Sequence, residues 1–183
     1  MAGGFYVQKI TSGDKTQVTY FYNSYASMTF TNTHTSAVSI DLYVTSQLGS
    51  DITTTGVYAA ETEAASSSSV TLTIDNGSGS ASAGTSDMFL NERVYKSDGS
   101  LFGVCSAFTS TVAIVFATGL TNAITDNDIL FTGTRYTMLN AVEIPANTAL
   151  QLHPEDFNFN TNNYNLYIDS SNASGLIDII TRY

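Results

Sequence analysis

The side chains that could do chemistry are few and lie far apart. The chain has one cysteine, Cys105, and two histidines, His34 and His153, and a cysteine nucleophile needs a basic partner that lowers the pKa of its thiol. Cys105 lies instead in the apolar stretch Val104–Phe108, and both histidines stand beside turn residues. We therefore expect Cys105 to be a small buried apolar residue, and we predict no catalytic residue and no enzyme activity.

One short run of oxygen-bearing side chains could bind a metal. Asp126, Asn127 and Asp128 follow one another, but the run lacks the glycine and the distant glutamate of a calcium-binding loop. Successive Asx residues also form turns, because their side chains accept hydrogen bonds from nearby backbone N–H groups. We predict an Asx-type turn here and no metal site.

Two acidic pairs and one glycine run are the remaining candidates for catalytic or phosphate-binding residues. Glu61/Glu63 and Glu155/Asp156 are isolated pairs, whereas a glycosidase needs two carboxylates that face each other across a cleft. Gly77-Ser-Gly precedes neither a helix pattern nor the Gly-Lys-Ser/Thr ending of a phosphate-binding loop. The sequence therefore predicts no cofactor.

Aromatic side chains form the densest local cluster. Tyr20, Phe21, Tyr22 and Tyr25 lie within six residues, so alternation along a strand cannot direct all of them into one core. They fit a sheet covered on both faces, a contact surface for another subunit, or a surface that stacks on sugar rings. We favour subunit contact over sugar and treat these four residues as candidate contact residues.

Composition indicates an all-β protein without a nucleic-acid partner. Only 12% of the 183 residues are charged, which removes the usual material of exposed helices, while threonine and aromatic residues suit strands. The formal charge is −10 with six Lys plus Arg, too few for a large basic face. The N-terminus lacks a signal-peptide pattern and no apolar run could span a membrane. We expect no nucleic acid and no membrane as partners.

The two ends of the chain predict one sandwich. Ser27–Asn32 and Val38–Val44 alternate apolar and polar residues and are predicted to form a hairpin. Ile40-Asp-Leu-Tyr-Val44 is similar to Tyr164-Asn-Leu-Tyr-Ile168 near the other end. Leu176–Ile180 is predicted to be a buried strand, because a free apolar tail would be a pairing hazard. We place a β-sandwich at residues 1–45 and 134–183.

The middle of the chain, residues 46–133, is predicted to be an insertion. Residues 46–87 form a Ser/Gly-rich loop region that contains a strand near Val70–Ile74 and one possible helical turn at Ala59–Ala65. We expect Ser66–Gly84 to be ordered by neighbouring subunits. Residues 88–133 form a small β-subdomain of four short strands, starting with Met88–Tyr95 and a turn at Lys96–Gly99.

Several segments together resemble small β-sandwich structural proteins of tailed bacteriophages. They are the hairpin pattern from Ser27 to Val44, Val142-Glu-Ile-Pro-Ala-Asn-Thr-Ala-Leu-Gln-Leu152, Val94–Gly103, and an ending, Tyr164–Tyr183, that looks especially like those of marine cyanophages. The resemblance implies a virion component, either a decoration protein or a neck or tail accessory protein. It brings no catalytic residues.

These observations lead to one prediction and two alternatives. The fold is predicted to be all-β, an antiparallel, jelly-roll-like β-sandwich with an inserted small β-subdomain. The function is predicted to be that of a phage capsid decoration or cement protein, present in many copies, made in the host cytoplasm and found in the virion with other virion proteins as partners. The alternatives are a neck or tail accessory protein and a carbohydrate-binding module for host adsorption.

Overall fold

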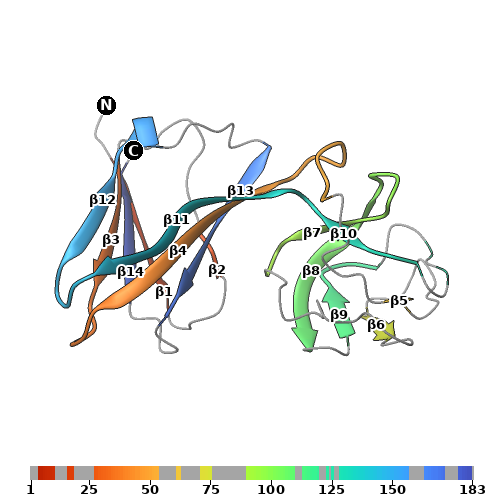
Figure 1. The fold of residues 1–183 in the computed structure, drawn as a ribbon, viewed down its shortest axis with the longest axis horizontal. Coiled ribbons are helices and arrows are strands. Elements are labelled where there is room, and N and C mark those ends of the chain that lie inside the picture. Colours follow the sequence, from red (N-terminus) through yellow and green to blue (C-terminus); the bar gives the residue numbers. More distant parts are fainter. Residues whose placement is uncertain are drawn as a thin grey trace. The chain divides into compact units, whose positions relative to one another are not determined.

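The structure is a computed structural model that divides into two compact units. It describes residues 4–10, 16–18, 27–53, 61–62, 71–75, 90–109, 113–119, 123, 125, 128–156, 163–171 and 177–182. The sandwich unit comprises residues 1–44 and 136–183, and the insert unit comprises residues 45–135. The boundaries expected from the sequence lie at residues 45/46 and 133/134. Each unit is built from antiparallel strands (Figure 1), so the predicted all-β sandwich class is confirmed.

In the described residues of the sandwich unit, eight strands make up two four-stranded sheets. They are β1 (Phe5–Ile10), β2 (Thr16–Gln17), β3 (Ser27–Asn32), β4 (Val38–Ser46), β11 (Arg135–Ile144), β12 (Ala149–Leu152), β13 (Tyr164–Ser170) and β14 (Ile177–Arg182). The strand order is β1-β14-β3-β12 in the first sheet and β11-β4-β13-β2 in the second. Successive strands therefore alternate between the sheets, except that β4 and β11 are neighbours.

This strand order is that of a jelly roll. The first and last strands, β1 and β14, are neighbours in one sheet, and the second and second-last strands, β2 and β13, are neighbours in the other. Such nesting of the chain ends is the double Greek key of eight-stranded jelly rolls. The insert unit enters between β4 and β11, the middle strands of the series, at the one connection that stays within a sheet.

Alternating apolar residues build the core between the two sheets. In β4 the side chains of Val38, Ile40, Leu42 and Val44 are buried, while the intervening residues are half-buried. The similar segment Tyr164–Ile168 lies in β13, the neighbour of β4. The likeness of the two segments therefore reflects two adjacent central strands that bury the same kind of face.

The predicted hairpin between Ser27–Asn32 and Val38–Val44 is wrong. β3 pairs with β12 and β14 in the first sheet, whereas β4 lies between β11 and β13 in the second. Residues 33–37 thus cross from one sheet to the other. Alternation correctly indicated one buried face on each strand, but it carries no information about which strand pairs with which.

A buried asparagine holds this crossing in place. Asn32 has no exposed surface, and its Nδ2 donates hydrogen bonds to the carbonyl oxygens of Ser36 at 2.9 Å and Ile144 at 2.9 Å. Its Oδ1 accepts a hydrogen bond from the His34 backbone N–H at 2.8 Å. The crossings from β3 to β4 and from β11 to β12 therefore lie side by side (Figure 1), tied together by one amide side chain whose polar atoms are satisfied.

Two successive, partly buried side chains of β11 pack against the core. They belong to Met138 and Leu139, a pair that regular alternation would forbid. Two residues after Leu139, Ala141 has a positive φ of 50°, and its N–H donates to Asp41 Oδ1 of β4 at 2.6 Å. The aspartate thus supports the unusual backbone of the neighbouring strand.

The C-terminal strand is buried as predicted. β14 lies between β1 and β3, and Ile177, Ile179 and Thr181 are buried in it. Leu176, the first residue of the predicted strand, lies outside the described residues. The end of the chain therefore occupies a central position in its sheet.

Over its described residues, the insert unit contains one six-stranded antiparallel sheet. Its strands are β5 (Glu61–Thr62), β6 (Thr71–Asp75), β7 (Arg93–Tyr95), β8 (Leu101–Thr109), β9 (Ala113–Phe116) and β10 (Phe131–Thr132), in the order β10-β7-β8-β9-β6-β5. Phe102 and Phe116 meet edge to face in its core with ring centroids 5.3 Å apart. Apolar residues of four strands are buried there, including Leu72, Val94 and Ile114.

Two predictions within the insert are corrected. The strand predicted at Met88–Tyr95 begins only at Arg93, because Leu90 and Asn91 form a turn in which Asn91 has a φ of 66°. The possible helical turn at Ala59–Ala65 is wrong, since Glu61–Thr62 pairs with β6 as a strand. Pairing with a neighbouring strand outweighs the local preference of a short alanine-rich segment.

The turn after β7 agrees with its sequence signal. Gly99 has a φ of 81° and donates its N–H to the Lys96 carbonyl oxygen at 3.0 Å, while Asp98 Oδ1 accepts the Ser100 N–H at 2.8 Å. This is the left-handed position that glycine tolerates best. The hydrogen bonds from Ser100 lower the pKa of Asp98.

Helical structure is minor in the part of the chain that is described. It is limited there to a single 3-10 turn, η3 (Pro154–Asp156). No helix in the described ranges has the length and apolar character needed to cross a membrane.

Candidate contact surface

The outward face of the first sheet carries Phe5, the most exposed of the large apolar side chains that the structure describes. β1 pairs with β14 so that Phe5 lies opposite Arg182, Val7 opposite Ile180 and Lys9 opposite Asp178. Ile10 at the end of β1 is buried, so alternation directs the odd-numbered residues of this strand away from the core. The same register turns Ile180 outward, because its neighbour Ile179 is buried.

Exposure agrees with this assignment for the outward residues, and Tyr6, which alternation directs to the other face, is also 36% exposed. Phe5 is 70% exposed and Val7 is 43% exposed, and Ile180 is half-buried. We call Phe5, Val7 and Ile180 the apolar edge patch. Two exposed apolar side chains that adjoin a half-buried one on the same sheet face form a contiguous apolar surface, which is typical of surfaces that contact other molecules.

Charged groups border the apolar edge patch on two sides. Lys9 Nζ lies 3.7 Å from Asp178 Oδ2, and the Lys9 side chain is 72% exposed. Arg182 stands beside Phe5 at the other end of β1 and is exposed. An exposed ion pair contributes little to stability, but two of the six cations of an acidic chain lie here beside exposed apolar groups, which suits recognition.

The strand that carries the patch is fixed from two directions. Among the described strands, β1 is at the edge of its sheet and pairs with β14 along its full length. On the core side, Gln8 Nε2 donates to the Gln17 carbonyl oxygen of β2 in the other sheet at 2.8 Å. The patch therefore stands on a positioned strand rather than on a free terminus.

Simple counting along the sequence could have revealed the patch. Phe5-Tyr-Val7 is a run of three large apolar residues, and Ile179-Ile180 is a pair. A strand that faces one core can bury only alternate residues, so at least one member of each run has to face outward. The aromatic cluster predicted to form contacts, Tyr20, Phe21, Tyr22 and Tyr25, lies outside the described residues.

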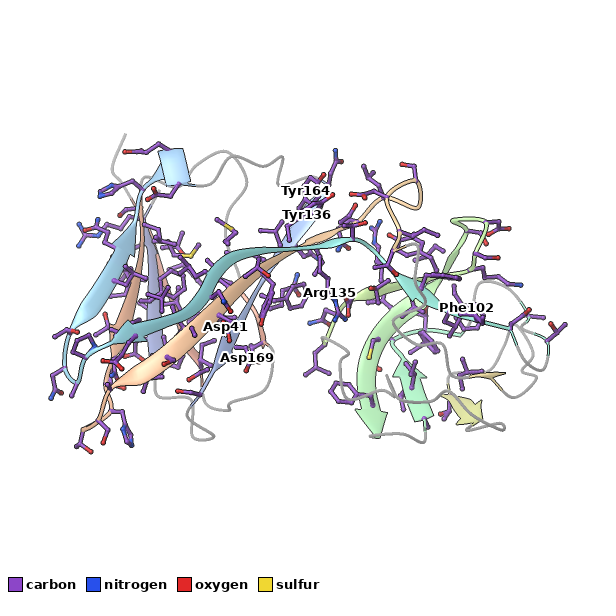
Figure 2. All side chains as sticks on the ribbon, viewed as in Figure 1. Asp41, Phe102, Arg135, Tyr136, Tyr164 and Asp169 are labelled. Carbon is purple, nitrogen blue, oxygen red and sulfur yellow. The ribbon has the colours of Figure 1, made fainter. Side chains whose placement is uncertain are left out.

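Another aromatic pair lies on the sandwich unit. Tyr136 of β11 and Tyr164 of β13 meet edge to face, with ring centroids 6.1 Å apart (Figure 2). Tyr136 is 47% exposed, while Tyr164 is packed against the core. Tyr164 thus anchors Tyr136, which presents part of its ring to solvent.

The residues singled out for possible catalysis have structural surroundings. Cys105 is buried, and burial, aided by the nearby charge of Glu92, raises the pKa of its thiol to about 12, which keeps it protonated and unreactive. His34 Nδ1 accepts the Ser36 N–H at 3.1 Å, and the His153 N–H donates to Asp156 Oδ2 at 2.7 Å. Both histidine contacts organise turns.

The acidic turn of the insert is described in part. Asp128 Oδ2 accepts the Thr125 N–H at 3.0 Å, which lowers the pKa of Asp128, and its own N–H donates to the Thr125 carbonyl oxygen at 3.2 Å. Asp126 and Asn127 lie outside the described residues. Among those that are described, no group of three or more His, Cys, Asp or Glu side chains could hold a metal ion.

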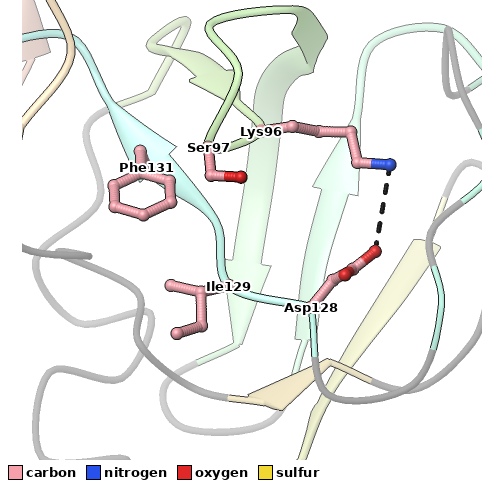
Figure 3. A pocket seen from close by; sticks show the side chains of 5 residues that line it. All are labelled: Lys96, Ser97, Asp128, Ile129 and Phe131. Atoms are coloured by element: carbon pink, nitrogen blue, oxygen red, sulfur yellow. Dashed lines mark ion pairs between the residues drawn. The ribbon is translucent and has the colours of Figure 1, made fainter.

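A small pocket opens on the insert unit beside this turn. It has a volume of about 240 Å³ and is lined by Lys96, Ser97, Asp128, Ile129 and Phe131 (Figure 3). Lys96 Nζ lies 3.8 Å from Asp128 Oδ2 and donates to the Ala123 carbonyl oxygen at 3.3 Å. The pocket thus combines two apolar side chains with a charged pair and a hydroxyl.

A buried ion pair in the insert has no recognisable pattern in the sequence. Glu92 is 1% exposed, and its carboxylate accepts two hydrogen bonds from Arg135, at 2.9 Å from Nε and 2.7 Å from Nη2. Next to it, Arg93 Nη1 donates to the Gln47 carbonyl oxygen at 2.8 Å. These contacts bind β7 to the two segments through which the chain enters and leaves the insert unit, so their geometry supports a structural role.

Comparisons with known proteins leave the contact surface as the main guide to function. Neither a protein-family model, nor a curated protein, nor a solved structure matches the chain.

Proposed function

We propose that the chain is a structural protein of a tailed-bacteriophage virion, a decoration or cement protein that binds the assembled capsid shell. The observation that carries this proposal is the apolar edge patch of Phe5, Val7 and Ile180 on the outside of a jelly roll. Jelly rolls recur in viral capsid proteins and in lectins. Fold alone does not decide between such functions, so the proposal rests on the surface.

The mechanism is adhesion rather than catalysis. Apolar area removed from water contributes about 25 cal/mol per Å², so a patch of this kind can add affinity without any chemical step. A standard interface buries on the order of 1,600 Å² in total, more than the patch itself provides, so flanking polar residues such as Thr29 and Gln151 of the same outward face would join the contact. Repetition over a shell strengthens modest individual affinities by avidity.

Co-sedimentation with shells tests this function. Shells assembled from the major capsid protein of the same phage are incubated with the wild-type chain and pelleted. Ile180→Lys places a charge in the centre of the patch, and we expect at least about a tenfold loss of shell affinity. Ile129→Lys makes the same change on the insert unit at a residue that is 44% exposed, and it should bind like wild type. A wild-type chain that stays in the supernatant contradicts the proposal.

The neck or tail accessory role uses the same surface and differs in location. A ring of neck subunits would offer far fewer binding positions than a shell. Immunogold labelling of intact particles separates these two roles, since label over the whole head supports the decoration role and label confined to the head–tail junction supports the accessory role.

Carbohydrate binding is a second candidate function, and the pocket of the insert unit favours it. Phe131 and Ile129 offer apolar contact for a sugar ring, and Asp128, Lys96 and Ser97 offer partners for hydroxyl groups. Binding to a panel of bacterial surface glycans, lost in Phe131→Ala, would support this role. Absence of binding to every glycan in the panel would count against it.

A further inference from the structure

We propose that two copies of the chain associate through β1, edge to edge and antiparallel, about a twofold axis that passes between the two Val7 residues. The first sheet of one copy would then continue into the first sheet of the other. A second copy of the chain would then be the first partner of the apolar edge patch. This dimer rests on the contact role proposed for that surface.

In the part of the chain that the structure describes, the composition of β1 carries little that would block pairing at its edge. An edge strand exposes backbone N–H and C=O groups, and proteins that avoid edge pairing place proline, charge or a bulge there. Phe5–Ile10 contains no proline, its pairing with β14 is regular over six residues, and its one charged residue is Lys9. That charge is compensated within the same molecule by Asp178 at 3.7 Å, so it opposes association only weakly.

The faces of β1 restrict how two copies can pair. Residues opposite each other in an antiparallel pair lie on the same face of the sheet. Because Phe5, Val7 and Lys9 face outward and Ile10 faces inward, only registers that pair odd with odd residues keep both faces intact. A slip of one residue would turn the buried face of one copy toward solvent.

Among these registers, the one centred on Val7 pairs all three outward residues with each other. Val7 meets Val7 of the second copy, and each Phe5 meets the second copy's Lys9. A register centred on Tyr6 would leave Lys9 beyond the second copy's strand, and one centred on Gln8 would do the same to Phe5. The Val7 register is therefore the self-complementary one, as a twofold interface requires.

Each contact in this register is favourable by its chemistry. A lysine ammonium over a phenylalanine face gains a cation–π interaction, and the twofold axis provides it twice. The two Val7 side chains remove each other from water at the centre. Strand addition supplies backbone hydrogen bonds along the edge. Arg182, beside Phe5, adds a positive charge near the interface, so the acidic chain is less negative there than its net charge suggests.

The oligomeric state of the purified chain, without shells, tests the inference. We expect a mass near twice the 19.6 kDa of the chain in sedimentation equilibrium at about 50 μM. Val7→Lys and Val7→Glu each place like charges opposite each other on the axis, and each should weaken the dimer at least about tenfold. Ile129→Lys is the matched control, because it is 44% exposed against 43% for Val7, and it should remain dimeric.

Mixing the two variants gives the sharpest test. A residue on a twofold axis meets its own copy, so Val7→Lys and Val7→Glu should form a mixed dimer with each other although each is monomeric alone. Thermal unfolding at the wild-type temperature would establish that both variants are folded. A monomeric wild-type chain, a dimer that survives Val7→Lys, or a mixture that stays monomeric would each overturn the proposal.

The test of the dimer and the test of shell binding can give different results. A monomer that still co-sediments with shells would refute the dimer and leave the decoration role intact. A dimer that binds no shell would do the reverse.

Discussion

At the scale of single residues, Cys105 is the side chain whose type is most reactive, and it serves in packing. Cys105 stands in β8 among the buried apolar residues of the insert, and burial raises its pKa to about 12. Its apolar sequence neighbours predicted this environment, because a cysteine within an alternating apolar strand follows the rules of a small hydrophobic side chain. Glu92, a buried carboxylate one strand away, could not be predicted in the same way.

The thiol of Cys105 should respond to pH through stability rather than through reactivity. Its pKa is raised in the folded state from 9.0 to about 12, so the unfolded chain loses the proton first as pH rises. The contribution of the protonated thiol to the free energy of unfolding is fully present below pH 9. It is lost between pH 9 and 12, at no more than about 1.4 kcal/mol per pH unit. Urea unfolding of wild type and Cys105→Ala across this range measures it. A thiol reagent that labels the native protein at pH 8 as fast as the unfolded chain would contradict burial.

The Glu92–Arg135 pair should matter through the cost of a lone buried charge. Arg135→Ala leaves the Glu92 carboxylate without its two hydrogen bonds, and we expect a loss of about 3–5 kcal/mol in the free energy of unfolding. Adding Glu92→Gln removes the charge and should restore part of the loss. Chemical denaturation of the two single variants and the double variant measures the coupling, and strictly additive losses would show that the pair acts as two independent residues.

At the scale of elements, alternation predicted strands well and partners poorly. Strands such as β4 and β8 carry their pattern locally, so their bounds agree with the sequence to within two residues. Pairing is different, because β3 and β4 are separated by only residues 33–37 and still belong to different sheets. The choice depends on distant groups, among them the Ile144 carbonyl oxygen that Asn32 binds across 112 residues of sequence.

The last strand offers a matched pair of isoleucines for testing which face is buried. Ile179 has no exposed surface and lies opposite Phe30, whereas Ile180 points outward opposite Val7. Ile179→Ala should cost about 2–5 kcal/mol of unfolding free energy because it leaves a cavity in the core. Ile180→Ala should cost less than about 1 kcal/mol. Equal losses in urea denaturation would mean that the register of β14 is wrong.

At the scale of the whole molecule, the chain is a jelly roll interrupted at its middle connection. The sandwich class and the presence of an insertion followed from patterns that repeat at both ends of the sequence. The nested order of the strands did not, because it depends on which distant strands meet, and single-strand patterns do not encode this. The apolar edge patch could not be assembled from the sequence either, because its residues come from β1 and β14, which lie at opposite ends of the sequence and meet only through strand pairing.

The position of the insertion predicts that the sandwich unit folds without it. β4 and β11 are neighbours in their sheet, so a two-residue Asn-Gly turn can join Ser46 to Arg135 in place of residues 47–134. We expect the shortened chain to unfold cooperatively and to keep a β-type circular dichroism spectrum. The shortened chain should also carry Arg135→Thr, because the deletion leaves the guanidinium of Arg135 without Glu92. If this variant shows no cooperative unfolding transition, the insert is required for folding.

The copy number of the chain in purified particles tests the proposed role most directly. Quantitative mass spectrometry of intact virions, calibrated with labelled peptides and normalised to the major capsid protein, gives this number. A capsid decoration protein should be present in hundreds of copies, whereas a neck protein would be present in about a dozen. Particles that contain none of the chain would contradict a virion role altogether, and a count of a few copies would contradict decoration of the shell.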